Sequence, residues 1–280
     1  MNKKSPQKEL RTIQKIVKSA KYILGTVCTY MLKETGMLFE VVDNDSRAKL
    51  ILYKLGVIKN MNFHFGKLIV TVKGYRILFE YKGHRVRFAF DNYRQLCNSL
   101  YLIKEQFAEE TYAWLNVAGE VVINIGACVG DTAIYFALNG ASEVYGYEPF
   151  PYTYSTAMKN TKAYKQIHIY REAVGGGHKT IYLSPKGTFM GTSTDARGEV
   201  PVQQITIKEA IARTKAPSYV MEMDCEGAES EIFKSVDKST LEGCKKLMIE
   251  CHVNSEPILS KLRELGFKAY TEKGLIRAAK

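Results

Sequence analysis

Short apolar runs alternate with amphipathic stretches from Glu120 to the end of the chain. An unbroken apolar run of about five residues fits a strand buried on both faces, and amphipathic stretches between such strands fit helices packed on a parallel sheet. The pattern therefore predicts an α/β, Rossmann-like fold with right-handed crossovers and helices on both faces. The predicted strands are 121–125, 143–147, 167–170, 219–223 and 246–251. A helix near 257–265 and short runs at 267–270 and 274–276 predict a closing hairpin with an antiparallel strand.

The first 110 residues follow a different pattern and predict a smaller α+β accessory domain, 1–110, ahead of a main domain, 111–280. Ser5 and Pro6 suit a helix start, and a basic amphipathic helix follows to about Gly36, with a second short helix at 48–55, capped by Ser46. Three runs rich in β-branched and aromatic residues then predict an antiparallel meander at 68–72, 75–81 and 85–90. Helices are expected at 93–106 and 112–115.

Positive charge gathers in the front half. The 280-residue chain has 40 Lys and Arg against 29 Asp and Glu, a net charge of +11. Residues 1–118 hold 20 basic and 10 acidic side chains, so they carry nearly all of the excess. This asymmetry favours an anionic partner for the front half, such as RNA or an anionic membrane surface, against the alternative of a solvated Lys-rich surface. Basic residues interleaved with aromatics in the meander fit a phosphate-binding face, but an ordinary half-buried sheet gives the same alternation.

The cysteines and the first apolar stretch bear on the compartment. Six cysteines show no C-x-x-C pair, and in a chain of this size they are expected to be reduced thiols of a cytoplasmic protein. The apolar stretch Tyr22 to Leu32 is shorter than the roughly 20 residues that span a bilayer. No convincing cleavage site follows it, so export is not expected. The first helix leaves peripheral attachment to a membrane open.

The first strand of the main domain runs into a glycine-bracketed turn. After Asn124 come Gly126, Ala127, Cys128, Gly130 and Asp131, a spacing that suits backbone approaching a ligand at the start of a helix. In an open α/β sheet, ligands bind at the carboxyl ends of the strands. The next strand ends in Glu148 and Pro149, where a carboxylate can accept hydrogen bonds from the ribose hydroxyls of an adenosine. These residues predict a nucleotide-containing cofactor.

A second group of polar residues follows the later strands. The fourth strand ends in Asp224, with Glu226 and Glu229 just beyond, and the fifth ends in Glu250, followed by His252. Acids in a first helical turn also suit the helix dipole, which is the simpler reading of Glu226 and Glu229. Gathered on one rim, the group fits three tasks: deprotonating a hydroxyl, orienting it, or holding a divalent cation.

These segments together resemble the FkbM family of S-adenosylmethionine-dependent methyltransferases, over roughly Phe107 to Ile276. The family's D-x-G-A-N-x-G-D pattern resembles residues 124–131, and its E-P matches Glu148 and Pro149. Its K-x-D-x-E-G-x-E signature falls on residues 222–229, and its E-x-H on Glu250 and His252. Asn124, Cys128 and Glu222 replace the family's usual Asp, Asn and Lys. The resemblance implies a seven-stranded class I methyltransferase sheet and O-methylation of sugars, polyketides or related hydroxyl compounds.

The resemblance also implies roles for individual residues. Asp224 and His252 are expected to position and deprotonate a substrate hydroxyl, with Glu226 and Glu250 in support, and no metal ligand is predicted, although a divalent metal is compatible with this set. The expected S-adenosylmethionine contacts are Asn124, Gly126, Ala127, Cys128, Gly130, Asp131, Glu148, Pro149, Glu172, Ala173 and Asp224, with Glu172 and Ala173 at the adenine. The expected acceptor is a hydroxyl of a glycan, lipid or small molecule. The alternatives are an RNA methyltransferase that uses the basic front half, and a cofactor-binding protein with weakened catalysis, suggested by Asn124 and Cys128.

Overall fold

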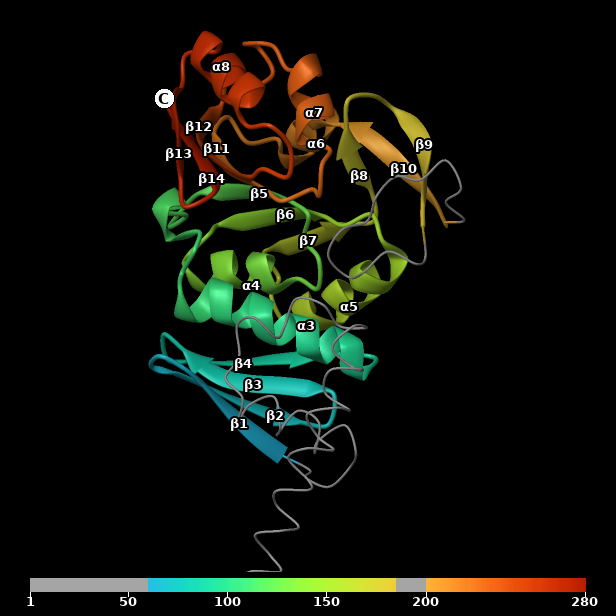
Figure 1. Cartoon of the computed structure of the whole chain (residues 1–280), viewed down its shortest axis with the longest axis vertical. Helices are drawn as coiled ribbons and strands as arrows, with labels where there is room; N and C mark the ends of the chain where they lie inside the picture. Colours follow the sequence, from blue (N-terminus) through green and yellow to red (C-terminus); the bar gives the residue numbers. More distant parts are fainter. Residues whose placement is uncertain (1–59, 185–199) are drawn as a thin grey trace, which may run out of the picture.

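A seven-stranded sheet forms the centre of the computed structural model, which describes residues 60–184 and 200–280 (Figure 1). Its strand order is β13-β14-β12-β11-β5-β6-β7, and only β14 runs antiparallel to its neighbours. The strands are β5 (Val121–Ile125), β6 (Glu143–Tyr147), β7 (Ile167–Tyr170), β11 (Tyr219–Met223), β12 (Cys244–Glu250), β13 (Lys268–Glu272) and β14 (Leu275–Ala279). The predicted α/β sheet and its closing antiparallel hairpin are confirmed.

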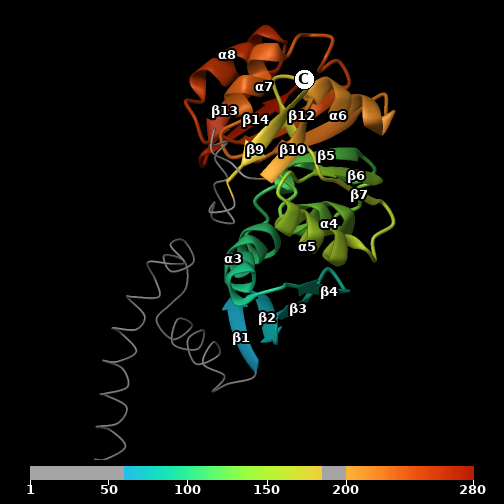
Figure 2. The same ribbon diagram turned by 90° about the vertical axis from the view of Figure 1, so that its right-hand side faces the viewer.

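Helices cover both faces of this sheet (Figure 2). On one side lie α4 (Asp131–Leu138) and α5 (Pro151–Thr161), and on the other lie α6 (Ile207–Thr214), α7 (Glu229–Ser235) and α8 (Glu256–Glu264). Successive side chains of β5 point to opposite faces of the sheet, so this one strand packs against both helical layers. Val122 packs into the cluster of the first side, whereas Ile123 and Ile125 pack into that of the second. Both layers are therefore built on strands whose two faces are apolar.

The front of the described chain forms a four-stranded antiparallel sheet, where the sequence predicted three strands. Its strands are β1 (Asn60–Phe65), β2 (Leu68–Lys73), β3 (Arg76–Tyr81) and β4 (His84–Ala89), in that order. The prediction missed β1, whose residues alternate strictly between exposed and buried. This strand has three polar side chains and no β-branched residue, so its residue types do not indicate a strand. The helices predicted at 5–36 and 48–55 lie outside the described residues.

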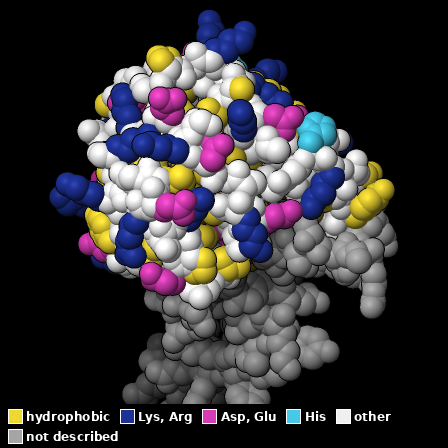
Figure 3. Space-filling model, turned by 90° about the horizontal axis from the view of Figure 1, so that it is seen from above, with side chains coloured by type: hydrophobic (Ala, Val, Ile, Leu, Met, Phe, Trp, Pro, Cys, Tyr) yellow, Lys and Arg dark blue, Asp and Glu magenta, His cyan; other side chains and the backbone are white. Residues whose placement is uncertain are grey.

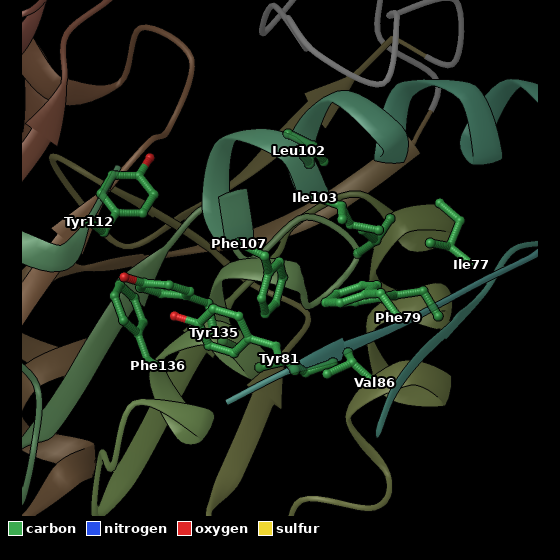
Figure 4. Packing of buried hydrophobic residues seen from close by; sticks show 14 of the residues in the cluster. Ile77, Phe79, Tyr81, Val86, Leu102, Ile103, Phe107, Tyr112, Tyr135 and Phe136 are labelled. Atoms are coloured by element: carbon green, nitrogen blue, oxygen red, sulfur yellow. The ribbon is translucent and has the colours of Figure 1, made fainter. Parts of the chain in front are cut away.

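Aromatic side chains join the front sheet to the helical layer of the main sheet. The connection runs through α3 (Tyr93–Ile103), a π-helical turn η1 (Lys104–Ala108) and a 3₁₀ turn η2 (Ala113–Leu115). The ring of Phe107 lies 5.1 Å from that of Tyr81 and 5.7 Å from that of Tyr135, measured between centroids (Figure 4). Edge-on packing of this kind stabilises an interface beyond the burial of its area. One continuous core thus crosses residue 110, and the two-domain division stays a prediction.

A smaller sheet lies beside the main one, and the sequence did not predict it. It has the order β8-β10-β9, with β8 (Ala173–Gly175) parallel and β9 (Lys179–Leu183) antiparallel to β10 (Val200–Thr206). A capping box in which Thr206 and Glu209 exchange hydrogen bonds then starts α6. None of the described helices is both long enough and apolar enough to cross a membrane.

Candidate functional site

The carboxyl ends of β5, β6, β11 and β12 meet along one edge of the main sheet. After β5 the chain moves outward to β6, whereas β11 pairs with the other side of β5, so the strand order reverses between them. Open α/β sheets bind their ligands at such a switch point. The structure therefore brings the turn after Asn124 and the acids after β11 to one place, as the sequence predicted.

Gly126 lies where two strand ends nearly touch. Its φ is +100°, and a Cβ added there would lie 1.8 Å from the backbone oxygen of Asp224. The backbone amides of Gly126 and Ala127 both donate to the carbonyl of Tyr147, at 2.9 and 3.0 Å. Only glycine fits this position, because any side chain would separate β5 from β11. At the other end of the turn, Gly130 precedes α4 with φ +84°.

Glu148 ties the turn to the strand beside it. Its Oε2 accepts from the backbone amide of Cys128 at 2.9 Å, and its Oε1 accepts from the amide of Phe150 and the hydroxyl of Thr153, at 2.9 and 2.6 Å. Burial raises the pKa of Glu148 to about 7, against the lowering by these hydrogen bonds. A carboxylate oxygen can accept two hydrogen bonds, so Oε2, which accepts one, retains capacity for a ligand hydroxyl. Pro149, next along, leads into α5.

Asn124 and Glu222 form a buried pair beneath the turn. They face each other in register on β5 and β11, and their exposed fractions are 0% and 1%. The amide nitrogen of Asn124 lies 2.5 Å from Oε2 of Glu222, while its Oδ1 has no partner among the described residues. Burial, reinforced by nearby Asp224, raises the pKa of Glu222 well above its ordinary value. Two of the three departures from the family pattern are therefore in contact with each other.

Asp131 opens α4 and is also buried, with an exposed fraction of 1%. Its Oδ1 has no hydrogen-bond partner among the described residues. Burial raises its pKa to about 6, against backbone hydrogen bonds that lower it. Cys128 lies three residues before Asp131, in the same turn. Its φ is +47°, a left-handed conformation that Asn adopts more readily than Cys.

His252 lies among the four acids that follow β11 and end β12. Its Nε2 lies 3.6 Å from Glu226, 3.8 Å from Asp224 and 3.9 Å from Glu250, in each case measured to a carboxylate oxygen. Burial and the neighbouring acids Glu250 and Glu226 raise the pKa of Asp224, and burial also raises the pKa of Glu250. All four predicted catalytic residues thus come together, on a rim that is only partly exposed.

Glu229 is a site residue that the sequence reading assigned to the helix dipole. It is fully buried in the first turn of α7, and its Oε1 lies 3.3 Å from Nδ1 of His252 and accepts from the amide of Gly227 at 3.1 Å. This contact with Glu229 is the main cause that raises the pKa of His252. Burial alone would raise the pKa of Glu229, but the hydrogen bonds from His252 and Gly227 lower it. Its place in the family signature was the signal that pointed to it.

Glu105 is a second residue that sequence reasoning missed. It lies in η1, in the front half, where no motif marks it. Burial and the charges of Glu250 and Asp131 raise its pKa to about 8. The charge of Glu105 also contributes to the raised pKa of Asp224, so the front half adds an acid to the electrostatics of the rim.

Two predicted contacts belong to a different cluster. Glu172 forms an ion pair with Arg213 of α6, whose guanidinium carbon lies 4.2 Å from the centroid of the Tyr170 ring. Ala173 is buried in β8 of the small sheet. The structure places both residues just beyond the end of β7, the strand next to β6. Their contact with an adenine stays a prediction.

The sheet order, the glycine turn at its switch point and the acids on the facing strand define a class I methyltransferase. The chain belongs to the FkbM methyltransferase family, because the model of the FkbM methyltransferase domain matches residues 124–269, more than half of its length. It is an S-adenosylmethionine-dependent methyltransferase. No curated protein matches the chain.

Solved structures give only a distant likeness. A magnesium protoporphyrin IX methyltransferase from Synechocystis PCC 6803 with bound S-adenosylmethionine is 15% identical, over 66% of this chain and 83% of that one, with a TM-score of 0.38. A protein from Pyrococcus horikoshii described as a candidate RNA methyltransferase is 14% identical, over 69% and 86%, with a TM-score of 0.37. These values carry no argument about the substrate.

Proposed function

We propose that this protein methylates a hydroxyl oxygen of a glycan, a lipid or a small molecule. The observation that carries the proposal is the meeting of Asp224, Glu226, Glu250 and His252 beside the Gly126 turn. An acceptor hydroxyl must lose its proton as it takes up a methyl group, and this rim concentrates groups that accept or direct a proton.

The turn has the features expected of the cofactor site. Gly126 allows the close backbone approach, Glu148 keeps an oxygen with hydrogen-bonding capacity, and Asp131 and Asn124 each carry a buried oxygen without a partner among the described residues. We therefore assign S-adenosylmethionine to this turn, with Gly126 to Asp131, Glu148 and Pro149 around it. When bound, it supplies a methyl group already activated by a sulfonium, which leaves as a neutral thioether.

Within this proposal, Asp224 accepts the hydroxyl proton. Its raised pKa, which burial and the acids around it produce, brings the carboxylate closer to the pH at which a general base works best. His252, held through Nδ1 by Glu229, directs the hydroxyl, and Glu226 and Glu250 stabilise the charge on the imidazole. Partial exclusion of water at the rim strengthens each of these interactions.

The test is transfer of a tritiated methyl group to fractions of glycans, lipids, small molecules and RNA. Asp224→Ala is expected to abolish incorporation while S-adenosylmethionine still binds in a calorimeter. Glu231→Gln, an exposed acid of the same helix α7 that pairs with Lys179, is the matched control and is expected to keep full incorporation. The proposal fails if the folded protein binds neither S-adenosylmethionine nor S-adenosylhomocysteine.

A hollow on the outer face of the front sheet favours a second candidate, methylation of RNA. The hollow has a volume of about 610 Å³, and its lining includes the cations Lys67, Arg85 and Arg87, the acid Glu80, which lies 3.8 Å from Arg85, and the apolar residues Ile69 and Leu78. The three cations in this lining suit contact with a phosphate backbone. In contrast, cationic and anionic side chains are interspersed on the end of the molecule that carries α8 (Figure 3). RNA affinity that does not fall with added salt would remove this candidate.

A further inference from the structure

The spacing of donor atoms around His252 is that of a coordination site. Three carboxylate oxygens surround Nε2 at 3.6 to 3.9 Å, which is beyond hydrogen-bond range. One donor atom each of Asp224, Glu226 and His252 lie within 4.8 Å of one another. Donors bound to one ion at about 2.1 Å lie about 3 to 4.2 Å apart, depending on the angle between them. A small closure of the rim would therefore bring these atoms to one ion.

Glu229 prepares the imidazole for such a role. It faces Nδ1 of His252, which leaves Nε2 directed at the three carboxylates. A carboxylate that holds the far nitrogen of a histidine is the usual outer partner in protein metal sites, because it fixes the tautomer and the ring orientation. Glu229 is fully buried, so its orientation is set by packing as well as by the hydrogen bond from Gly227.

Unpartnered oxygens provide an independent observation. Oδ1 of Asp224, which lies 3.8 Å from Nε2 of His252, is buried and accepts no hydrogen bond from the described residues. Oε2 of Glu229, on a side chain with no exposed surface, is also buried without a partner among the described residues. Buried polar atoms are almost always satisfied, so the Asp224 oxygen, which faces Nε2, indicates a ligand that completes the site.

The charge of the cluster is also unbalanced. Among the described residues, no lysine or arginine pairs with Asp224, Glu226, Glu229 or Glu250, and the imidazole of His252 is the only ion-pair partner of all four. One imidazolium cannot neutralise four carboxylates, and like charges this close together repel one another. A divalent cation would supply the missing positive charge.

We propose that Asp224, Glu226 and His252 bind one divalent cation of the Mg²⁺ or Mn²⁺ kind, with Glu250 as a fourth ligand. Three carboxylates suit these hard ions, and Mn²⁺ also accepts an imidazole. The role of the ion rests on the proposed function. The ion takes the place of the proton on Nε2 of His252, its remaining coordination positions hold the oxygen of the acceptor, and its charge eases transfer of the hydroxyl proton to the free carboxylate oxygen of Asp224. The binding of the ion is a separate property that is measured without any methyl transfer.

The experiment is a titration of the full-length protein with Mn²⁺, followed by electron paramagnetic resonance and calorimetry. One saturable site is expected. Glu226→Gln should weaken Mn²⁺ binding by at least tenfold, and Glu229→Gln, which keeps an acceptor for His252 but removes the charge, by about 10 to 100-fold. Glu231→Gln on the same helix should leave Mn²⁺ affinity unchanged, and thermal unfolding confirms that each variant is folded.

Two results would overturn the inference. One is a folded wild-type protein with no saturable Mn²⁺ site, and the other is equal Mn²⁺ affinity for the wild type and Glu226→Gln. Titration with S-adenosylmethionine in parallel separates this failure from that of the proposed function. Cofactor binding without Mn²⁺ binding rejects the metal site alone, whereas Mn²⁺ binding without cofactor binding rejects the proposed methyl transfer and leaves the metal site standing.

Discussion

The buried pair of Asn124 and Glu222 gives the sharpest test of how the site is built. Where the family has Asp and Lys, this chain has Asn and Glu, and the two side chains meet at 2.5 Å on adjacent strands with no more than 1% of either exposed. Asn124→Asp restores one family residue alone and places two carboxyl groups in contact. One of them must then hold a proton, or two like charges share a buried site.

The cost of Asn124→Asp follows from this geometry. Glu222 already has a strongly raised pKa, so the new aspartate brings one more acid into a site with no cation among its described contacts. Protonating an aspartate of ordinary pKa 3.9 at pH 7 costs about 4 kcal/mol, which sets the upper limit. We expect the variant to lose about 2–4 kcal/mol of unfolding free energy at pH 7. The deficit should shrink towards pH 4, because the folded-state pKa of the aspartate is raised and its protonated form is the one that fits.

Adding Glu222→Lys completes the family pair and should reverse the loss. Breaking a buried ion pair by removing one partner costs about 3–5 kcal/mol, so the double variant should show a favourable coupling energy of at least about 2 kcal/mol. Urea unfolding of the wild type, both single variants and the double variant at pH 7 measures this cycle. Effects that add to within about 0.5 kcal/mol would refute the reasoning, as would full stability of Asn124→Asp alone.

Three further predictions concern the turn and its neighbours. Gly126→Ala should lose at least about 3 kcal/mol of unfolding free energy and all S-adenosylmethionine binding in calorimetry, because its Cβ would meet the backbone oxygen of Asp224. The control is Gly227→Ala, at a similar φ of +105° but with open space around the added Cβ. It measures backbone strain alone and should lose only about 1–2 kcal/mol. Cys128→Asn should gain about 0.5–1 kcal/mol in urea unfolding, since Asn tolerates φ +47° better, and a loss of stability would contradict this. Burial raises the pKa of Asp131 to about 6 in the folded protein, from an ordinary value of 3.8. The unfolding free energy of the wild type should therefore fall by about 3 kcal/mol relative to that of Asp131→Asn as the pH rises from about 4 to above 6. Parallel pH profiles of unfolding free energy for the two proteins would reject the raised pKa.

The main sheet was predictable because its strands are buried on both faces. The ranges of β5, β6 and β11 match the apolar runs in the sequence, and the acids that end these strands come together because parallel strands end at one edge. Asp224 and His252 could thus be placed on one rim from strand order alone. In contrast, β1 is half-buried and carries a polar residue at every second position, so only the neighbouring β2 identifies it as a strand.

Side-chain pairing across the fold was the part that sequence could not supply. From the sequence, Glu229 is explained by the helix dipole. The structure shows that its Oε1 lies 3.3 Å from Nδ1 of His252, a residue 23 positions away. Glu105 carries no motif, and its pKa is raised because the fold buries it in η1 and places it near Glu250. The departures at Asn124 and Glu222 likewise looked independent in sequence, whereas register pairing makes them one structural unit. Each of these relationships depends on tertiary contact, which local patterns do not encode.

The layered architecture separates the positive front of the molecule from its acidic rim, and this restricts what the positive charge can do. The hollow lined by Arg85 and Arg87 lies on the outer face of the front sheet, and the layer of α3, α4 and α5 stands between that sheet and the main sheet (Figures 1 and 2). A helical layer is about 10 Å thick, so a small acceptor at the rim could not also reach the hollow. The front cations would therefore act only on an acceptor long enough to extend around the helical layer. It follows that strong salt dependence of methylation would indicate a polymeric anionic substrate, and its absence a small or neutral one.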